Sequence, residues 1–330
     1  MIVRSHAVAL LALLGSLVGS AACAPALRTA RLTADEPPTE REIEDANLIH
    51  HSDCAPRLSL IFPGTLALCE GRTAEGSALA GLGATELASG LAFGIKDGFG
   101  STQALLPFFV FSDLLAADSL DARLRQQRAL RLTYVPPETI PELAVAPFSP
   151  EILAEPAVWA GIAGTVGLGL LYSRLVDGPF DASNAGTRPV LFGRTVQTLP
   201  GYASAGAVGL GVFEHVSIAE EMIFRGYIQS GLTRRYGEDE GWLLGSLIFG
   251  AFHATNILFI DPGQRLHYLY ADVPFITVVG SYLGYAYRND RFSLSAPVAI
   301  HFWYDFLTEA ISFALDPKNS PLAVSWGSAF

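Results

Sequence analysis

Long apolar segments alternate with short polar loops over most of the chain, a pattern typical of a protein that crosses a membrane several times. A helix needs about 20 mostly apolar residues to cross the roughly 30 Å hydrocarbon core. We therefore predict an all-α fold, a polytopic transmembrane helical bundle with about six to eight membrane helices. The segments are Gly76–Ile95, Ser101–Ala117, Ala157–Leu175, Ala203–Leu232, Trp242–Ile260, Val273–Tyr287 and Leu294–Leu315.

The first 23 residues have the pattern of an export signal. Arg4 gives a positive start, Ala7–Val18 is apolar, and small residues precede Cys23. Cys23 in this position resembles a bacterial lipobox, although Ser20 stands where leucine is usual. Three outcomes stay open: lipidation at Cys23, cleavage after an alanine, and retention as a signal anchor.

Polar stretches divide the rest of the chain. Ala24–Arg57 is rich in acidic residues and is expected to be a flexible exported or juxtamembrane segment. Leu58–Cys69 is apolar but too short to span, and Pro63-Gly64 would break it. Val135–Pro156 is expected to be a surface connection. The predicted regions are a signal at 1–23, a polar region at 24–75, accessory membrane helices at 76–199, a membrane domain with the candidate chemistry at 200–316, and a tail at 317–330.

The composition favours a membrane protein and excludes nucleic-acid binding. Half of the 330 residues are hydrophobic and 16% are charged, whereas soluble domains contain about 25% charged residues. The net charge of −11 leaves no basic face to neutralise phosphates. We therefore expect a multi-pass protein of a cell membrane with membrane lipids as partners, and the lipobox-like Cys23 indicates a bacterial inner membrane.

The orientation in the membrane stays open. Arginines cluster at Arg123–Arg131, at Arg234-Arg235 and at Arg288/Arg291, and the positive-inside rule makes all three places cytoplasmic. The same trace puts Ala24–Arg57 in the cytoplasm, whereas a cleaved signal puts it outside. One segment counted as a span is then not one, or Leu58–Cys69 crosses with help from its neighbours.

Two of the three cysteines are candidates for a disulfide. If Cys23 carries a lipid, Cys54 and Cys69 remain as a pair, and an oxidising compartment would let them join. The alternative is two unrelated thiols, because Cys69 lies in an apolar run. A zinc site built on cysteines is not expected, because no CxxC spacing is present.

Three charges lie inside the apolar segment Ala203–Leu232, at Glu220, Glu221 and Arg225. Each charge at a bilayer centre costs about 2.5–3.5 kcal/mol, so such residues are functional candidates. On a helix, Glu221 faces Arg225 in the favourable order, and Glu220 points about 100° away. We interpret Glu221 as neutralised by Arg225, which leaves Glu220 as a candidate general base. A purely structural ion pair is the alternative.

Two later apolar segments each carry a histidine that shares a helical face with a second polar residue. His253 lies one turn before Asn256, and His301 lies one turn before Asp305. Histidines from different helices together with carboxylates match the ligand set of a catalytic Zn²⁺, which keeps one open position. Interhelical hydrogen bonds are the alternative for a single membrane histidine. The candidate metal ligands are His253, His301, Glu220 and Asp305.

The ordered set of motifs resembles the CPBP family of intramembrane metalloproteases, which includes the type II CAAX prenyl proteases. The matches are Glu220-Glu221-x-x-x-Arg225 followed by Gly226, then Phe249-x-x-x-His253 and His301-x-x-x-Asp305, with Gly280, Gly284 and Arg288 in the segment between the two histidine motifs.

The resemblance implies a metal-dependent endopeptidase that cleaves a membrane-associated peptide or protein near the membrane surface. Glu220 would activate water, with His253 and His301 as metal ligands or transition-state donors. Asp305 stands where many members have asparagine, so it either ligates the metal or, if protonated, stabilises the oxyanion.

Other functions use the same residues differently. A non-proteolytic scaffold, or a protective partner of the immunity type, would keep the polar set as a structural feature. A transporter with a Glu/His proton relay fits less well, because transporters usually show internal repeats and none is visible here. His215 and Glu214 are expected to be local polar packing before Glu220.

Overall fold

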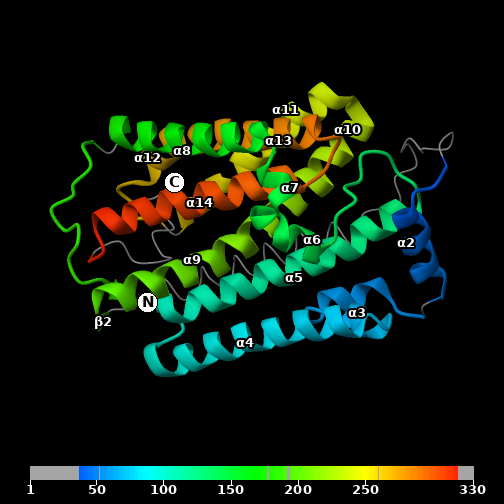
Figure 1. Ribbon diagram of the computed structural model, residues 1–330, viewed down its shortest axis with the longest axis horizontal. Helices are drawn as coiled ribbons and strands as arrows, with labels where there is room; N and C mark the ends of the chain where they lie inside the picture. Colours follow the sequence, from blue (N-terminus) through cyan, green and yellow to red (C-terminus); the bar gives the residue numbers. More distant parts are fainter. Residues whose placement is uncertain (1–36, 52, 177, 192–193, 259, 319–330) are drawn as a thin grey trace. The chain divides into compact units, whose positions relative to one another are not determined.

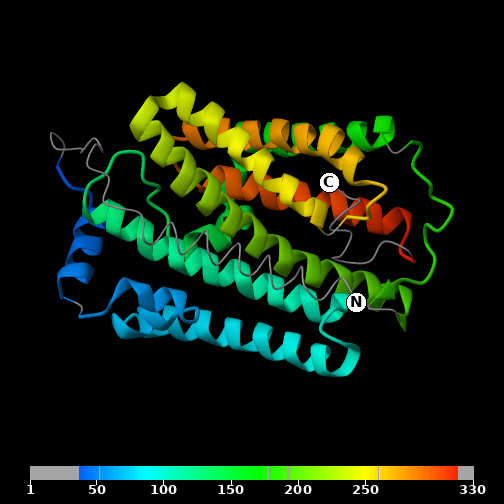
Figure 2. The ribbon, with the colours of Figure 1, turned by 180° about the vertical axis from the view of Figure 1, so that it is seen from behind.

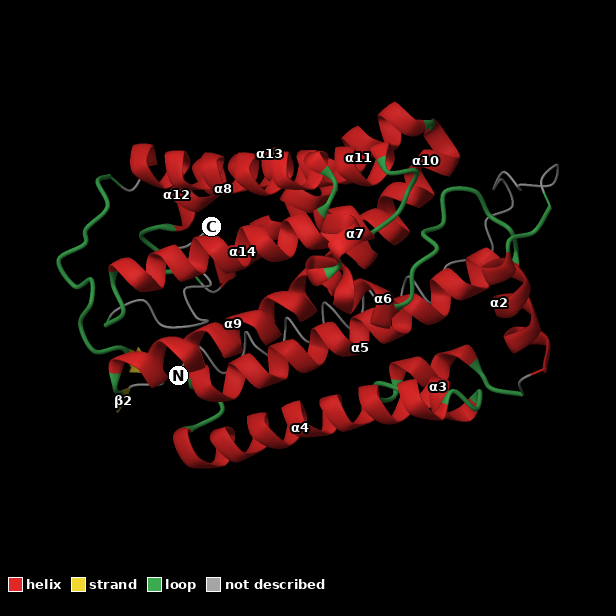
Figure 3. Cartoon of the chain, in the orientation of Figure 1, coloured by secondary structure: helices red, strands yellow, loops and turns green. Residues whose placement is uncertain are grey.

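Helices dominate the computed structural model, which describes residues 37–51, 53–176, 178–191, 194–258 and 260–318 (Figures 1 and 3). The predicted signal, Cys23 and most of the predicted tail lie outside these residues. The all-α class is confirmed for the described part, apart from a short hairpin of β1 (Val190–Leu191) and β2 (Arg194–Thr195).

The chain divides into two units. Unit 1 comprises residues 1–143, 218–245 and 287–294, and unit 2 comprises 144–217, 246–286 and 295–330. Helices α9 (Thr198–Glu221), α11 (Glu238–His253) and α13 (Val273–Asn289) each contribute residues to both units. Each unit is therefore described by itself.

A helical hairpin forms the frame of unit 1. Helix α4 (Thr73–Asp97) packs along α5 (Thr102–Ala129), and the two lie side by side in both views (Figures 1 and 2). Small residues permit this approach, as predicted for the Gly/Ala-rich segment, because a Cβ at Gly90 would lie only 2.9 Å from the Phe108 ring. Both helices are longer than the apolar segments that predicted them, since polar residues extend their ends.

Short helices cover the C-terminal end of α5. They are α2 (Glu40–His51), η1 (Pro56–Leu60) and α3 (Thr65–Cys69). We call residues 40–51 and 53–72 the cap. The predicted break at Pro63-Gly64 is confirmed, and Gly64 has φ +79°, a conformation that favours glycine.

The expectation of a flexible segment up to Arg57 is wrong from residue 40 onward. Helix α2 is held by an ion pair from the Asp45 carboxylate to Arg128 of α5, with a distance of 2.6 Å. Burial raises the pKa of Asp45, and the charge of Arg128 opposes that rise. Composition indicates only that α2 is polar, whereas its order comes from partners far away in the sequence.

Unit 1 is completed by a helical run that enters it at Ile218. The last residues of α9 lead into a π-helical segment, η3 (Met222–Gln229), and then into α10 (Ser230–Tyr236). The segment η3 packs against α5. Gly237, with φ +109°, ends the run, and α11 begins at Glu238.

Unit 2 is built around the pairing of α8 (Pro156–Val176) with α14 (Ser295–Leu315). Its core includes Val158, Ile162 and Ile300.

The predicted surface connection Val135–Pro156 instead contains the short elements α6 (Ile140–Val145), η2 (Ala146–Phe148) and α7 (Pro150–Leu153). Several of its apolar side chains are buried, so this prediction is wrong in that part. The remaining elements are η4 (Ala254–Leu258), α12 (Arg265–His267) and η5 (Tyr268–Asp272).

Four helices of the described part are long and apolar enough to cross a membrane. They are α4, α5 from Gln103, α8, and the stretch Glu238–Leu258 that comprises α11 and η4. The predicted segments at Ala203–Leu232, Val273–Tyr287 and Leu294–Leu315 are helical, but they are not among these four. A membrane protein is thereby supported, whereas the expected six to eight spans stay a prediction.

Candidate functional site

The Glu221–Arg225 pair lies in the interior of unit 1. Oε1 of Glu221 accepts a hydrogen bond from Nη1 of Arg225 at 2.8 Å, and the two residues are 0% and 1% exposed. The predicted pairing along one helical face is confirmed. At this burial, removal of either residue would leave the other without its ion-pair partner in an apolar interior.

The backbone at this pair departs from the expected regular helix. The α-helix ends at Glu221, and the next eight residues form the π-helical segment η3. Its first residues hold Arg225, and its end is tied by a hydrogen bond from Ser230 Oγ to the Arg225 carbonyl at 3.2 Å. π-Helical turns occur frequently at functional sites. No sequence pattern identifies them, so this feature was missed.

Glu220 is half-buried and faces a different environment from Glu221. Its charge acts on the Arg225 guanidinium and on the carboxyl group of Asp113, which α5 contributes. Asp113 is only 7% exposed, and its Oδ2 accepts no hydrogen bond from the residues that the structure describes. The sequence analysis missed Asp113, although an acidic residue inside an apolar span is the same signal that singled out Glu220.

In unit 2, His253 is held in a defined tautomer. Its Nδ1 lies 2.9 Å from the carbonyl oxygen of Phe249. A carbonyl oxygen only accepts, so the neutral ring carries its proton on Nδ1 and a lone pair on Nε2. A backbone bond of this kind is compatible with metal binding through the other nitrogen, but it also occurs at histidines without that role.

His301 and Asp305 face each other along α14. Nε2 of His301 lies 3.4 Å from Oδ2 of Asp305, and each residue is 6% exposed. Their shared helical face is confirmed. A buried carboxylate at this distance orients the ring.

The Phe249 ring contacts both histidines. Its centroid lies 4.5 Å from that of His253 and 6.5 Å from that of His301. Unit 2 therefore brings together the two histidine motifs that are far apart in sequence. Tyr268, which the sequence did not single out, donates to the His253 carbonyl at 3.2 Å and accepts from Asn256 at 3.0 Å.

The predicted metal ligands divide between the units. Glu220 belongs to unit 1, whereas His253, His301 and Asp305 belong to unit 2. Within the described residues, no group of three or more His, Cys, Asp or Glu side chains is placed to hold a metal ion. The tautomer of His253 and the carboxylate beside His301 nevertheless fit the chemistry of Zn²⁺ ligands. Zinc therefore stays a prediction.

Neighbouring polar residues of α9 have ordinary roles. Nδ1 of His215 lies 2.8 Å from the carbonyl of Gly211, four residues earlier in the same helix. This is the local polar packing that was predicted for His215.

Comparison with known proteins supports the resemblance. Residues 203–307 match the family model described as "Rce1-like: Type II CAAX prenyl endopeptidase Rce1-like". The match covers all six candidate residues. The family is one of CAAX-type intramembrane proteases, so it supports a hydrolase in a membrane. None of the curated proteins or solved structures compared with the chain matches it.

Proposed function

We propose that this protein, whose residues 203–307 match the type II CAAX prenyl endopeptidase model, is an intramembrane endopeptidase that uses a divalent metal ion, Zn²⁺. It cleaves a peptide bond of a membrane-associated peptide or protein near the membrane surface. The observation that carries the proposal is the joint presence, within the matched segment, of a buried Glu221–Arg225 pair beside Glu220 and of two supported histidines. A bacterial inner membrane is the proposed location.

Each candidate side chain has a role that its surroundings support. Glu220, which is not the principal partner of Arg225, accepts a proton from the attacking water. Nε2 of His253 and the ring of His301 would hold the metal, and Asp305 orients His301. When bound, Zn²⁺ polarises the scissile carbonyl and makes water more acidic. Glu221 and Arg225 fix the π-helical turn that carries them, and so position Glu220.

A scaffold without activity is the competing function, because a buried ion pair and helix-bound histidines also stabilise a membrane bundle. The two functions differ in what they require of Glu220. A scaffold tolerates Glu220→Gln, which keeps the shape of the side chain and removes only its basicity. An endopeptidase does not tolerate this change.

The test measures peptidase activity and metal content of purified protein in detergent. We expect Glu220→Gln to lower kcat by about 10²–10⁴-fold, the usual contribution of a general base, with unchanged thermal unfolding. Glu214→Gln, on the same helix, is the matched control and should retain activity. His253→Ala should lower the zinc content as well as the activity. A folded wild-type protein without metal and without activity would favour the scaffold.

A further inference from the structure

Two buried hydroxyl groups meet at the end of the π-helical segment η3. Ser230 is the first residue of α10, directly after η3, and Tyr287 lies near the end of α13. Their oxygen atoms are 2.7 Å apart, and both residues are 0% exposed. Ser230 Oγ also lies 3.2 Å from the carbonyl oxygen of Arg225. All three residues belong to unit 1, and the proposed chemistry assigns no role to either hydroxyl group.

The distances indicate the direction of these hydrogen bonds. Each hydroxyl group has one proton to donate, and a carbonyl oxygen only accepts. If Ser230 donates to the Arg225 carbonyl, Tyr287 donates to Ser230. In the reverse arrangement Ser230 donates to Tyr287, which donates to the Tyr134 carbonyl at 3.5 Å. That distance is beyond the usual range of O–H···O bonds, so the chain of donors runs from Tyr287 through Ser230 to Arg225.

The Arg225 carbonyl is the acceptor that closes the π-helical turn. The backbone N–H of Ser230 donates to this carbonyl from five residues ahead, whereas an α-helix uses the N–H four residues ahead. The Ser230 side chain adds a second donor to the same oxygen. π-Helical turns are rare, and here Ser230 supplies two hydrogen bonds that favour one.

The form of this turn determines the direction of Glu220. After η3, Arg234 donates to the Thr133 carbonyl at 2.9 Å and to the Gln127 side chain at 3.2 Å, which fixes α10. A change of η3 to a regular α-helix would shift the residues on one side by one position, or about 100° of rotation and about 1.5 Å of rise. With α10 fixed, the shift would fall on Glu220 and Glu221.

Two residues in a strained conformation support Tyr287. Tyr134 and Phe292 have φ of +61° and +67°, in the left-handed region that bulky residues rarely adopt. Their ring centroids lie 4.5 Å apart, and the Phe292 centroid lies 5.3 Å from that of Tyr287. Arg128 holds the loop of Tyr134 through a hydrogen bond to the Pro136 carbonyl at 2.9 Å. Strain of this kind persists where the surrounding structure fixes it, and it is concentrated at functional sites.

We propose that Ser230 and Tyr287 are positioning residues, whose hydrogen-bonded chain keeps η3 in its π-helical form and holds Glu220 in place for the reaction. The effect on η3 follows from the contacts alone. The effect on the reaction rests on the proposed peptidase function.

Hydroxyl deletions test the effect on the reaction. Ser230→Ala and Tyr287→Phe each remove one oxygen atom, and cleavage of quenched fluorescent casein is measured in detergent. We expect Ser230→Ala to lower kcat by about 10²-fold, as a misplacement near 1 Å does, with little change in KM. Tyr287→Phe should lower kcat less, because Ser230 still reaches the Arg225 carbonyl.

The double variant Ser230→Ala/Tyr287→Phe should be no slower than Ser230→Ala, since residues in one hydrogen-bond chain do not act additively. An unchanged kcat in Ser230→Ala, or additive losses in the double variant, would overturn this part of the proposal.

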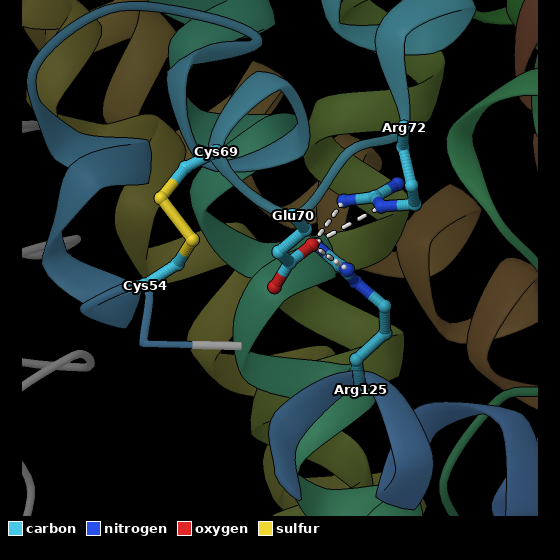
Figure 4. Close-up of a disulfide and its surroundings, with 5 residues drawn as sticks. All are labelled: Cys54, Cys69, Glu70, Arg72 and Arg125. Carbon is cyan, nitrogen blue, oxygen red and sulfur yellow. Dashed lines mark hydrogen bonds and ion pairs between the residues drawn. A yellow bond between two sulfur atoms is a disulfide. The ribbon is translucent and has the colours of Figure 1, made fainter. Parts of the chain in front are cut away.

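The cap supplies a control for a general loss of stability. Cys54 and Cys69 are joined, with Cα atoms 5.9 Å apart, which settles the alternative of two unrelated thiols (Figure 4). Directly after Cys69, the Glu70 carboxylate pairs with Arg125 of α5 at 2.7 Å and with Arg72 at 2.9 Å (Figure 4). These contacts attach the cap to α5, so Cys54→Ser/Cys69→Ser should lower the Tm without a change in kcat.

Ser119→Ala is the control for the loss of a buried hydroxyl group. Ser119 Oγ donates to the Ser59 carbonyl at 2.9 Å, and the Gly64 N–H donates to Oδ2 of the preceding residue, Asp118, at 3.0 Å. Like Ser230→Ala, this change removes a buried oxygen that donates to a backbone carbonyl of unit 1. It should leave kcat unchanged. A loss of kcat in either control as large as in Ser230→Ala would overturn the proposal.

Hydrogen exchange separates the effect on η3 from the effect on activity. Peptides that cover residues 222–230 should exchange about tenfold faster in Ser230→Ala, as expected for the loss of one hydrogen bond, whereas peptides from α4 should exchange as in the wild type. Equal exchange in the wild type and the variant would contradict the role of Ser230 in η3. Absence of cleavage by the wild type would contradict the peptidase function and the effect on the reaction, and exchange would still decide the effect on η3.

Discussion

At the scale of single residues, the buried pair of Glu221 and Arg225 yields the sharpest stability prediction. Arg225→Met removes the ion-pair partner of Glu221, which is 0% exposed. Removal of one partner from a buried pair costs about 3–5 kcal/mol. We expect a loss of that size in the free energy of unfolding, measured by denaturation in detergent micelles.

The double variant Glu221→Gln/Arg225→Met distinguishes a structural pair from a catalytic one. It removes both charges, so most of the lost stability should return. If the pair only positions Glu220, activity should return with the fold, whereas a direct catalytic role would leave the refolded double variant inactive. Arg235→Met is the matched control, because Arg235 is exposed on the same run of helix and lies over the Tyr236 ring. A loss in the control as large as in Arg225→Met would refute the burial argument.

At the scale of elements, the approach of α13 to α11 controls the histidine region of unit 2. A Cβ on Gly280 would collide with the Phe249 ring, which contacts both His253 and His301. We expect Gly280→Ala to destabilise the protein by about 1–3 kcal/mol, the usual cost of overpacking. Under the proposed function, the shifted histidines should also lower kcat/KM by about 10²-fold, as a misplacement near 1 Å does.

Two variants make this prediction specific. Phe249→Leu combined with Gly280→Ala makes room for the new methyl group and should recover part of the stability. Gly164→Ala, in α8 of the same unit, adds a methyl group where no atom lies within 4 Å. It should be neutral or slightly stabilising, because alanine favours a helix by about 1 kcal/mol over glycine. Equal losses in Gly164→Ala and Gly280→Ala would contradict the packing argument.

Elements are also the scale at which the sequence was most informative. Apolar length predicted the bounds of α4, α8 and α14 closely, because a long apolar helix is a local property of about 20 residues. The 3.6-residue period likewise placed Glu221 opposite Arg225 and His301 opposite Asp305. The π-helical turn η3, the order of α2 and the role of Tyr268 depend on contacts between distant residues. Periodicity and composition cannot contain this information.

At the scale of the whole molecule, predictions made from single segments of the sequence differ from the structure that those segments form together. The arginines near the end of α5 have the pattern of a cytoplasmic loop, and the acidic stretch before Arg57 has the pattern of a disordered one. In the structure the cap packs on this end of α5, where Asp45 and Glu70 of the cap pair with Arg128 and Arg125. A charge count by segment fails here because opposite charges from separate segments are buried against each other.

The disulfide should contribute to the stability of the cap. A crosslink that closes a loop of about 15 residues contributes about 3 kcal/mol, and Cys54 and Cys69 are 15 residues apart. We expect Cys54→Ser/Cys69→Ser to lower the Tm in detergent and to expose α2 to limited proteolysis. The rest of the chain should stay folded, because the Asp45–Arg128 pair and the contacts of Gly64 and Ser59 remain. Reductant should reproduce this effect in the wild type and have none in the double variant, and Cys23→Ser should behave as the wild type. An equally resistant α2 in the double variant would show that the ion pairs alone hold the cap.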